Sequence, residues 1–211
     1  MTTSVSPARR AAPAYAVPPA ALLAGLLLGV LTNLAQGLLP GNWNQIANSG
    51  AIWSVAAFAA GAVLARRVSV PLAAVAGLCA EVGLVAGYYG YAEFGRDGMG
   101  SLAAPLVWLA MALVAGPLFG AAGAWWRRGT TVVRRVTGLA AMAGVFGMEG
   151  AHYALVLHYA PQAWGCFLAL LLVPLAARSH RERALTLAAS VPLAAVAYLV
   201  VDQAVLGTLL G

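Results

Sequence analysis

Charged residues are scarce in this sequence, and lysine is missing altogether. Only 9% of its 211 residues are charged, 62% are hydrophobic, and the mean hydropathy is +0.85. A soluble domain carries about 25% charged residues, so the surface of this chain must face an apolar medium. The absence of lysine also excludes a retinal or pyridoxal Schiff base, and with it a rhodopsin-like function.

Cysteine and the short motifs of enzymes and metal sites are equally sparse. Cys79 and Cys166 both lie in apolar runs, as packing residues do, and there is no CxxC pair or zinc spacing. H-E-x-x-H, G-x-S-x-G and phosphate-binding glycine loops are also missing. Glu149 and His152 form a single E-x-x-H pair, whereas carboxylate-bridged metal sites need that motif twice. We therefore expect no metal and no cofactor, and enzymatic activity has no direct support.

What the sequence does contain is a series of long apolar runs separated by short polar segments. Runs of about 17 to 25 residues suit a hydrocarbon core of roughly 30 Å. They predict an all-α integral membrane protein, a bundle of seven transmembrane helices, with six as the alternative. Residues 1–16 are expected to be a disordered cytoplasmic tail and residues 17–211 a single transmembrane domain. The predicted helices are about 17–39, 49–65, 70–89, 102–126, 136–157, 163–177 and 184–206.

The arginines alternate with the apolar runs in a way that fixes the predicted orientation. All twelve basic residues are arginine, and eleven of them fall on one predicted side, leaving Arg96 on the other. Under the positive-inside rule this places the N-terminus in the cytoplasm, and seven helices then place the C-terminus outside. The formal charge of +6 therefore reflects loops at a cell membrane, not a groove for nucleic acid.

The segment MEGAHYALVLHY, residues 148–159, places ionisable groups inside an apolar run. Glu149 and His152 are three residues apart, so they share one face of a helix. Ionisable side chains at membrane depth are costly and by default mark a pore, a proton relay, a ligand site or a buried pair. This segment is therefore the centre of the predicted functional site.

Other polar side chains fall in the outer halves of the predicted helices, whereas the inner halves are almost wholly Ala, Val, Leu and Gly. From this asymmetry we predict a polar pocket that opens to the outer face and binds a small solute. The alternative is that these groups only satisfy one another. The candidate ligand-binding residues are Asn33, Gln36, Asn44, Asn48, Trp53, Glu81, Tyr88, Glu149, His152 and Asp202.

Three functions fit these features. The first is a carrier, or the binding subunit of a carrier, that takes a small solute from the outer face. The second is an intramembrane enzyme acting on a lipid or isoprenoid, in which Glu149 and His152 are an acid–base pair assisted by Glu81. The third is a structural or assembly protein whose polar residues lock the helices together. In each case the lipid bilayer is a partner and nucleic acid is not.

Two stretches carry a resemblance to a known family. LTNLAQGLLPGNWNQIANSGAIWSVAAFAAG and GYYGYAEFGRDGMGS resemble those of a family of small actinobacterial membrane proteins, a domain of unknown function. The overall plan is also similar to the substrate-binding subunits of energy-coupling-factor vitamin transporters. That similarity implies a solute bound at the outer side and partner transporter subunits, for which Ala20 and Ala24 offer a small-x-x-x-small docking face. Gly25 and Gly29 are predicted to form a close-packing face of the first helix.

Overall fold

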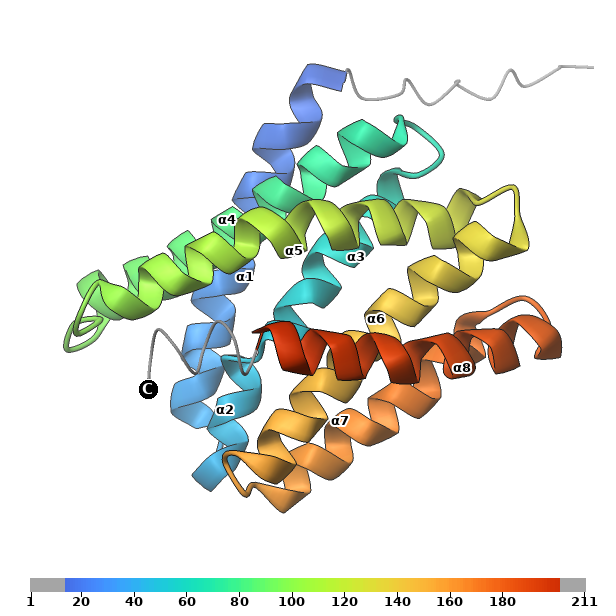
Figure 1. Cartoon of the computed structure of the whole chain (residues 1–211). Helices are drawn as coiled ribbons and strands as arrows, with labels where there is room; N and C mark the ends of the chain where they lie inside the picture. The colour runs from blue at the N-terminus through green and yellow to red at the C-terminus, as the bar shows by residue number, and fades with distance from the viewer. Residues whose placement is uncertain (1–13, 202–211) are drawn as a thin grey trace, which may run out of the picture.

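The computed structural model describes residues 14–201, which fold into helices joined by short turns (Figure 1). No β-strand occurs within that range, so the predicted all-α fold is confirmed. Two short 3-10 helices, η1 (Ala14–Ala16) and η2 (Gly41–Trp43), and the four-residue α2 (Asn44–Ala47) lie near the N-terminal end, and η3 (Val173–Ala176) follows α7. The longer helices are α1 (Val17–Leu38), α3 (Gly50–Leu64), α4 (Val70–Gly95), α5 (Ala103–Arg128), α6 (Val132–Leu155), α7 (Ala160–Leu172) and α8 (His180–Ala197).

Five helical segments of the described chain are long and apolar enough to cross a membrane. The segment that contains α5, for example, is 26 residues long with a mean hydropathy of 1.9, and α4 has the same length and hydropathy. At 1.5 Å per residue such a helix exceeds the roughly 30 Å hydrocarbon core. The protein is therefore a helical multi-pass membrane protein. The five segments are Ala14–Leu38, Gly41–Leu64, Val70–Gly95, Ala103–Arg128 and His180–Val201.

The two remaining long helices differ from these five for physical reasons. Helix α6 is 24 residues long, but it starts at Val132, so it includes Arg134 and Arg135 as well as Glu149. It packs against α3, α5, α7 and α8, so protein and not lipid covers most of its surface. Helix α7 has only 13 residues before it tightens into η3 at Pro174.

Local signals in the sequence explain where several helices begin. The side chains of Ser49, Ser69, Thr131 and Ser179 each accept a hydrogen bond from a backbone N–H in the first turn of α3, α4, α6 and α8, respectively. These caps satisfy amide groups that have no partner within the helix. Helices α1, α4 and α7 also have proline in their first turn, where its missing N–H costs nothing.

Glycines let the backbones of α1 and α4 touch. A side chain at Gly25 or Gly29 would meet the backbone carbonyls of Ala80 or Leu84 in α4. On the facing helix, a side chain at Gly83 or Gly87 would in turn meet the backbone of α1. The prediction that Gly25 and Gly29 form a close-packing face is thus confirmed. Gly83 and Gly87 form a second GxxxG pair on the facing surface of α4.

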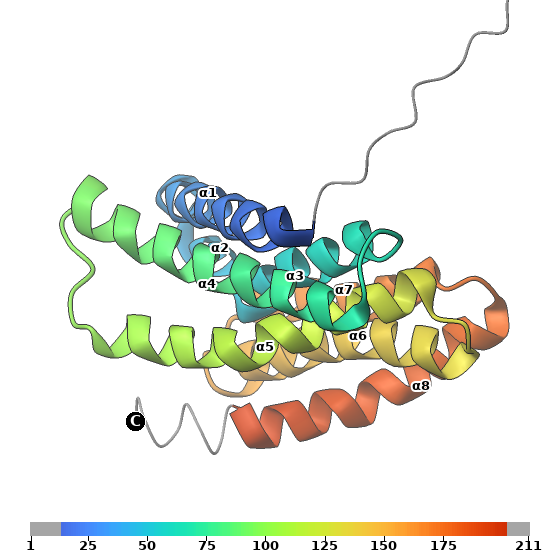
Figure 2. The same cartoon turned by 90° about the horizontal axis from the view of Figure 1, so that it is seen from above.

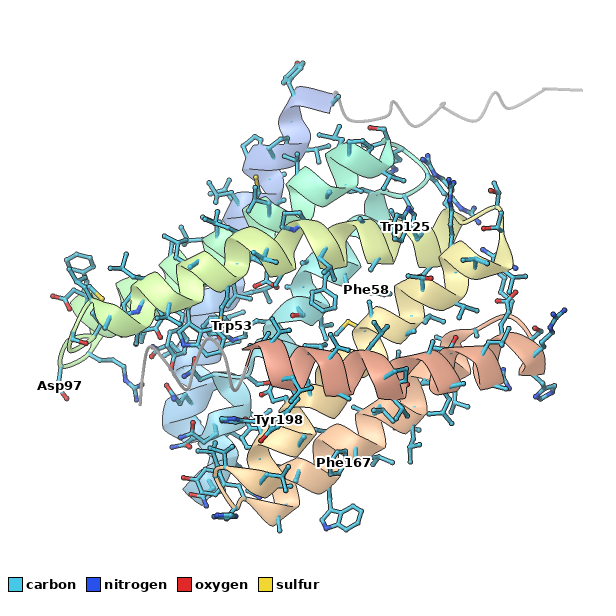
Figure 3. All side chains as sticks on the ribbon, viewed as in Figure 1. Trp53, Phe58, Asp97, Trp125, Phe167 and Tyr198 are labelled. Carbon is cyan, nitrogen blue, oxygen red and sulfur yellow. The ribbon has the colours of Figure 1, made fainter. Side chains whose placement is uncertain are left out.

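Helix α4 lies between α1 and α5, whereas α8 packs mainly against α6. Turning the molecule by 90° shows α1 and α8 on opposite sides of the bundle (Figure 2). Large apolar side chains such as Trp53, of which 2% of the surface is exposed, lie among the helices (Figure 3). Asp97 projects outward from the α4–α5 loop (Figure 3). Glycine pairs such as Gly61 with Gly120 continue the close packing between α3 and α5.

The arginines gather at one end of the described bundle, where they tie neighbouring turns together. The Arg128 guanidinium donates to the Val68 carbonyl, and the Arg178 guanidinium to the Arg127 carbonyl. Arg135 forms an ion pair with Glu182 across α6 and α8, with N and O atoms 2.5 Å apart. Arg96 lies at the other end, in the α4–α5 loop. That loop is on the left in Figure 1.

The α1–α4 contact predicts opposite effects for two glycine-to-alanine substitutions. Gly29→Ala should lower the free energy of unfolding by about 1–3 kcal/mol, because the new methyl group overlaps the α4 backbone. Gly90→Ala, also within a helix but with no neighbouring atom within 4 Å, should leave stability unchanged or raise it by up to about 1 kcal/mol. Unfolding titrations in detergent measure both. Equal losses for the two variants would contradict the packing.

Candidate functional site

Glu149, the central residue of the sequence prediction, caps the start of helix α3. Its carboxyl oxygen Oε2 accepts a hydrogen bond from the Ala51 backbone N–H at 2.5 Å. The side chains of Ser49 and Tyr153 also interact with this carboxyl group. A carboxylate at a helix N-terminus is stabilised by the free N–H groups and by the helix dipole. Glu149, only 7% exposed, is therefore a satisfied group that holds α6 against α3.

His152 and Tyr153 lie beside Glu149 on the last turns of α6. The ring of His152 packs at an angle on that of Tyr153, with centroids 6.2 Å apart. The Tyr153 hydroxyl donates to the Gln45 carbonyl at 3.3 Å, which ties α6 to the short helix α2. These contacts connect three helices around the start of α3.

A second polar cluster joins α1 to the half of α4 that lies away from the arginine-rich end. The Asn33 side-chain amide donates to the Tyr88 carbonyl at 3.0 Å, and the Tyr88 hydroxyl donates to Gln36. Arg96 closes the cluster by donating to the Asn33 side-chain oxygen at 3.0 Å. The structure thus brings Asn33, Gln36 and Tyr88 together, but their hydrogen-bonding groups are used between the two helices.

The remaining polar candidates lie elsewhere. Asn44 opens α2 and Asn48 follows it, and their side-chain oxygens are buried with no hydrogen-bond partner in the described part of the chain. Asp202 lies outside the described residues. The polar candidates therefore occupy distinct places along the bundle.

Trp53 lies between the polar clusters and an apolar cavity. Its indole N–H donates to the Ala47 carbonyl at 3.0 Å. The centroid of its ring lies 5.2 Å from that of Tyr88 and 5.0 Å from that of Trp108, and both pairs of rings are tilted, by 59° and 49°. This aromatic cluster of α3, α4 and α5 forms one end of the cavity.

Glu81 faces this cavity from the middle of α4. The side chain is 4% exposed, and its oxygen Oε1 is buried with no hydrogen-bond partner among the described residues. The cavity has a volume of about 520 Å³ and is lined almost entirely by apolar side chains of α3, α5, α6 and α8. An unsatisfied buried carboxyl oxygen costs folding free energy, on the order of 1–3 kcal/mol. A hydrogen-bond donor in the cavity would remove that cost.

The cavity opens on the lateral surface of the bundle. Its rim includes Val114 of α5, which is 69% exposed, and Val200 beyond α8, which is 54% exposed. Exposed apolar side chains in the middle of membrane-spanning helices face lipid. The predicted pocket opens to the outer aqueous face, whereas this opening lies on the side of the bundle between α5 and α8. Most of the cavity's lining residues belong to the halves of α3, α5, α6 and α8 that lie away from the arginine-rich end.

Sequence reasoning did not identify most residues of this cavity. Its walls include Ser54, Trp108, Met111 and Met148, which in sequence look like ordinary apolar-helix residues. The available signal was proline inside a helix, since Pro117 interrupts α5 and Pro192 interrupts α8, the two helices that border the opening. Each interior proline removes one backbone hydrogen bond and weakens the helix locally.

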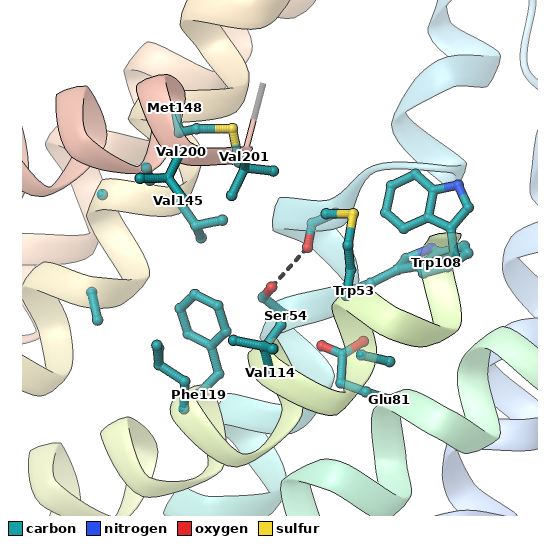
Figure 4. Close-up of a pocket in the computed structure, with 18 of the residues that line it drawn as sticks. Trp53, Ser54, Glu81, Trp108, Val114, Phe119, Val145, Met148, Val200 and Val201 are labelled. Atoms are coloured by element: carbon teal, nitrogen blue, oxygen red, sulfur yellow. Dashed lines mark hydrogen bonds between the residues drawn. The ribbon is translucent and has the colours of Figure 1, made fainter. Parts of the chain in front are cut away.

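The described walls of the cavity carry few polar side chains. Ser54, the cavity's hydroxyl group, donates to the Gly50 carbonyl at 2.8 Å, shown as the dashed line in Figure 4. Glu149 and His152 do not line the cavity, so they do not form an acid–base pair with Glu81 across it. Within residues 14–201 there is also no group of three or more His, Cys, Asp or Glu side chains with metal-binding geometry.

The capping role of Glu149 predicts a loss of stability in its absence. Glu149→Ala should lower the free energy of unfolding by about 1–3 kcal/mol, because the buried Ala51 N–H loses its acceptor. Glu149→Gln keeps an acceptor oxygen and should lose less. Glu93→Ala, which removes an exposed carboxyl group bonded to the Met99 N–H, serves as the control and should change stability by under about 0.5 kcal/mol. If Glu149→Ala unfolded like the control, the cap would be energetically irrelevant.

Comparison with known proteins identifies a family but no function. A family model described as a family of unknown function (DUF6518) matches residues 8–207. No curated protein and no solved structure matches the chain. The resemblance to an uncharacterised family is thereby confirmed: this chain belongs to the DUF6518 family.

Proposed function

We propose that this membrane protein binds an amphipathic small molecule that enters from the lipid between α5 and α8. The observation that carries the proposal is the Glu81 side chain, which is 96% buried at the cavity wall while its Oε1 has no partner among the described residues. Polar groups buried in proteins are normally hydrogen-bonded. The missing donor is the head group of the ligand.

The shape and lining of the cavity define the rest of the ligand. A volume of about 520 Å³ falls within the range of roughly 300–1,000 Å³ that is typical of small-molecule sites. Away from Glu81 the walls are Val, Leu, Met and Phe side chains, which favour an alkyl or prenyl tail. The ligand therefore combines one hydrogen-bond donor with an apolar chain.

The proposed ligand enters the cavity from the lipid bilayer and not from the aqueous side. Val114 and Leu118 of α5 and Leu193 of α8 are exposed at the rim, so a molecule dissolved in the bilayer reaches the cavity without crossing a polar surface. A lipid-soluble ligand is also more concentrated in the bilayer than in water. Release to another protein or to the opposite leaflet would make the chain a carrier.

We also propose that the arginine-rich end faces the cytoplasm at the cell membrane. Arginine pairs or clusters follow α3, end α5, begin α6 and follow α7, whereas the opposite end holds Arg96 in the described chain. Positive residues near membrane helices are retained on the cytoplasmic side. In the half of α1 that lies nearer the arginine-rich end, Ala20 and Ala24 are exposed on the helix surface, where the proposed partner subunits could dock.

Blocking the cavity tests the proposed binding. The probe is dodecanol with a mid-chain diazirine, in phosphatidylcholine nanodiscs, and the labelled peptides are identified by mass spectrometry after illumination. We expect labelling of α5 and α8 in the wild-type protein and a loss of at least about fivefold in Ala115→Trp, which fills the cavity with an indole ring.

The matched control places the same tryptophan on the lipid-facing side of α5. Leu113 is 57% exposed and does not line the cavity, so Leu113→Trp should label like the wild-type protein. Equal labelling of all three proteins would mean that the probe reaches the helices from bulk lipid alone. That result would contradict the proposed site.

A further inference from the structure

We infer that the head group of the ligand is a protonated amine, recognised by Glu81 together with the indole rings of Trp53 and Trp108. This inference rests on the proposed binding function and specifies the charge of its ligand. Glu81, Trp53 and Trp108 lie at one end of the cavity, and Met148, Val200 and Val201 lie at the other (Figure 4). The cavity is thus itself amphipathic.

The charge balance of the cavity favours a cation. Glu81 is the one ionisable carboxyl group on its described walls, and no arginine or histidine lines it. Arg96 does not line the cavity and donates to Asn33 between α1 and α4 instead. A carboxylate in an apolar environment is stabilised chiefly by an opposite charge at close range. Because the described walls of the cavity supply no positive charge, the ligand must supply the one that pairs with Glu81.

The aromatic end of the cavity strengthens the same preference. The rings of Trp53 and Trp108 lie 5.0 Å apart at 49°, and both line the cavity. The faces of indole rings attract cations, most strongly where water is excluded. A protonated amine also carries N–H groups, so it supplies the hydrogen bond that Glu81 Oε1 lacks.

Neutral alternatives fit the cavity less completely. A long-chain alcohol donates one hydrogen bond to Glu81 but brings no charge to the indole faces. An anionic head group, such as a fatty acid carboxylate or a phosphate, would lie against Glu81 with like charge. The order of preference is therefore amine, then alcohol, then anion.

Two probes that differ only in head-group charge test this inference. Dodecylamine and dodecanol, each with the same mid-chain diazirine, are titrated into the wild-type protein in zwitterionic phosphatidylcholine nanodiscs, where surface charge does not concentrate the amine. We expect half-maximal labelling of α5 and α8 at about tenfold lower amine concentration. Competition with unlabelled dodecylamine and dodecanol should show the same order.

The variants separate the outcomes. Glu81→Gln should abolish the preference for the amine, whereas Glu93→Gln, the same change at an exposed position of the same helix, should keep it. Equal half-maximal concentrations for amine and alcohol in the wild-type protein would overturn this inference and leave the proposed function standing. Failure of both probes to label the cavity would overturn the proposed function itself. The wild-type titrations decide between these results even if Glu81→Gln fails to fold.

Discussion

The structure depends on one constraint, that a polar group in an apolar medium must find a partner. Three glutamates of the described chain are buried, and two of them meet this requirement within the protein. Glu149 accepts from the start of α3, and Glu182 pairs with Arg135. Both contacts join helices that are distant in sequence. Glu81 is the exception among the three, since its Oε1 has no described partner. Asn44 and Asn48 also have unpartnered buried oxygens, but Glu81 differs from them because it faces the cavity.

Close backbone packing makes this contrast possible. Where glycines face each other, as between α1 and α4 or between α3 and α5, the helices leave no space for a ligand. Helices α5 and α8 are not packed on each other in this way, because α8 contacts mainly α6. The cavity therefore lies where the small-residue contacts end. Pro117 and Pro192 weaken the helices on both sides of it, so the walls most able to move are those that border the opening.

Much of the fold followed from the sequence, because apolar length, proline, cap residues and arginine clusters are local signals. The same signals did not determine which helix contacts which. The helix contacts determine whether each candidate side chain is bonded within the protein or faces a cavity. Glu149 and His152 share a helical face as expected, but the face meets the start of α3, which no periodicity encodes. Likewise, Asn33 and Gln36 form hydrogen bonds with Tyr88 across the α1–α4 contact. Glu81 was recognisable as a buried carboxyl group, whereas its apolar cavity resembles any lipid-facing surface in sequence.

The most direct test asks which buried glutamate can be reached from lipid. Dicyclohexylcarbodiimide, an apolar reagent that adds to carboxyl groups, is mixed with the ligand-free protein in nanodiscs, where no amine is paired with Glu81. The modified residue is identified by mass spectrometry. Our account predicts modification of Glu81, which faces the lateral cavity, and protection of Glu149, which is enclosed by Ser49, Ala51 and Tyr153. Modification of Glu149 with Glu81 left intact would contradict it.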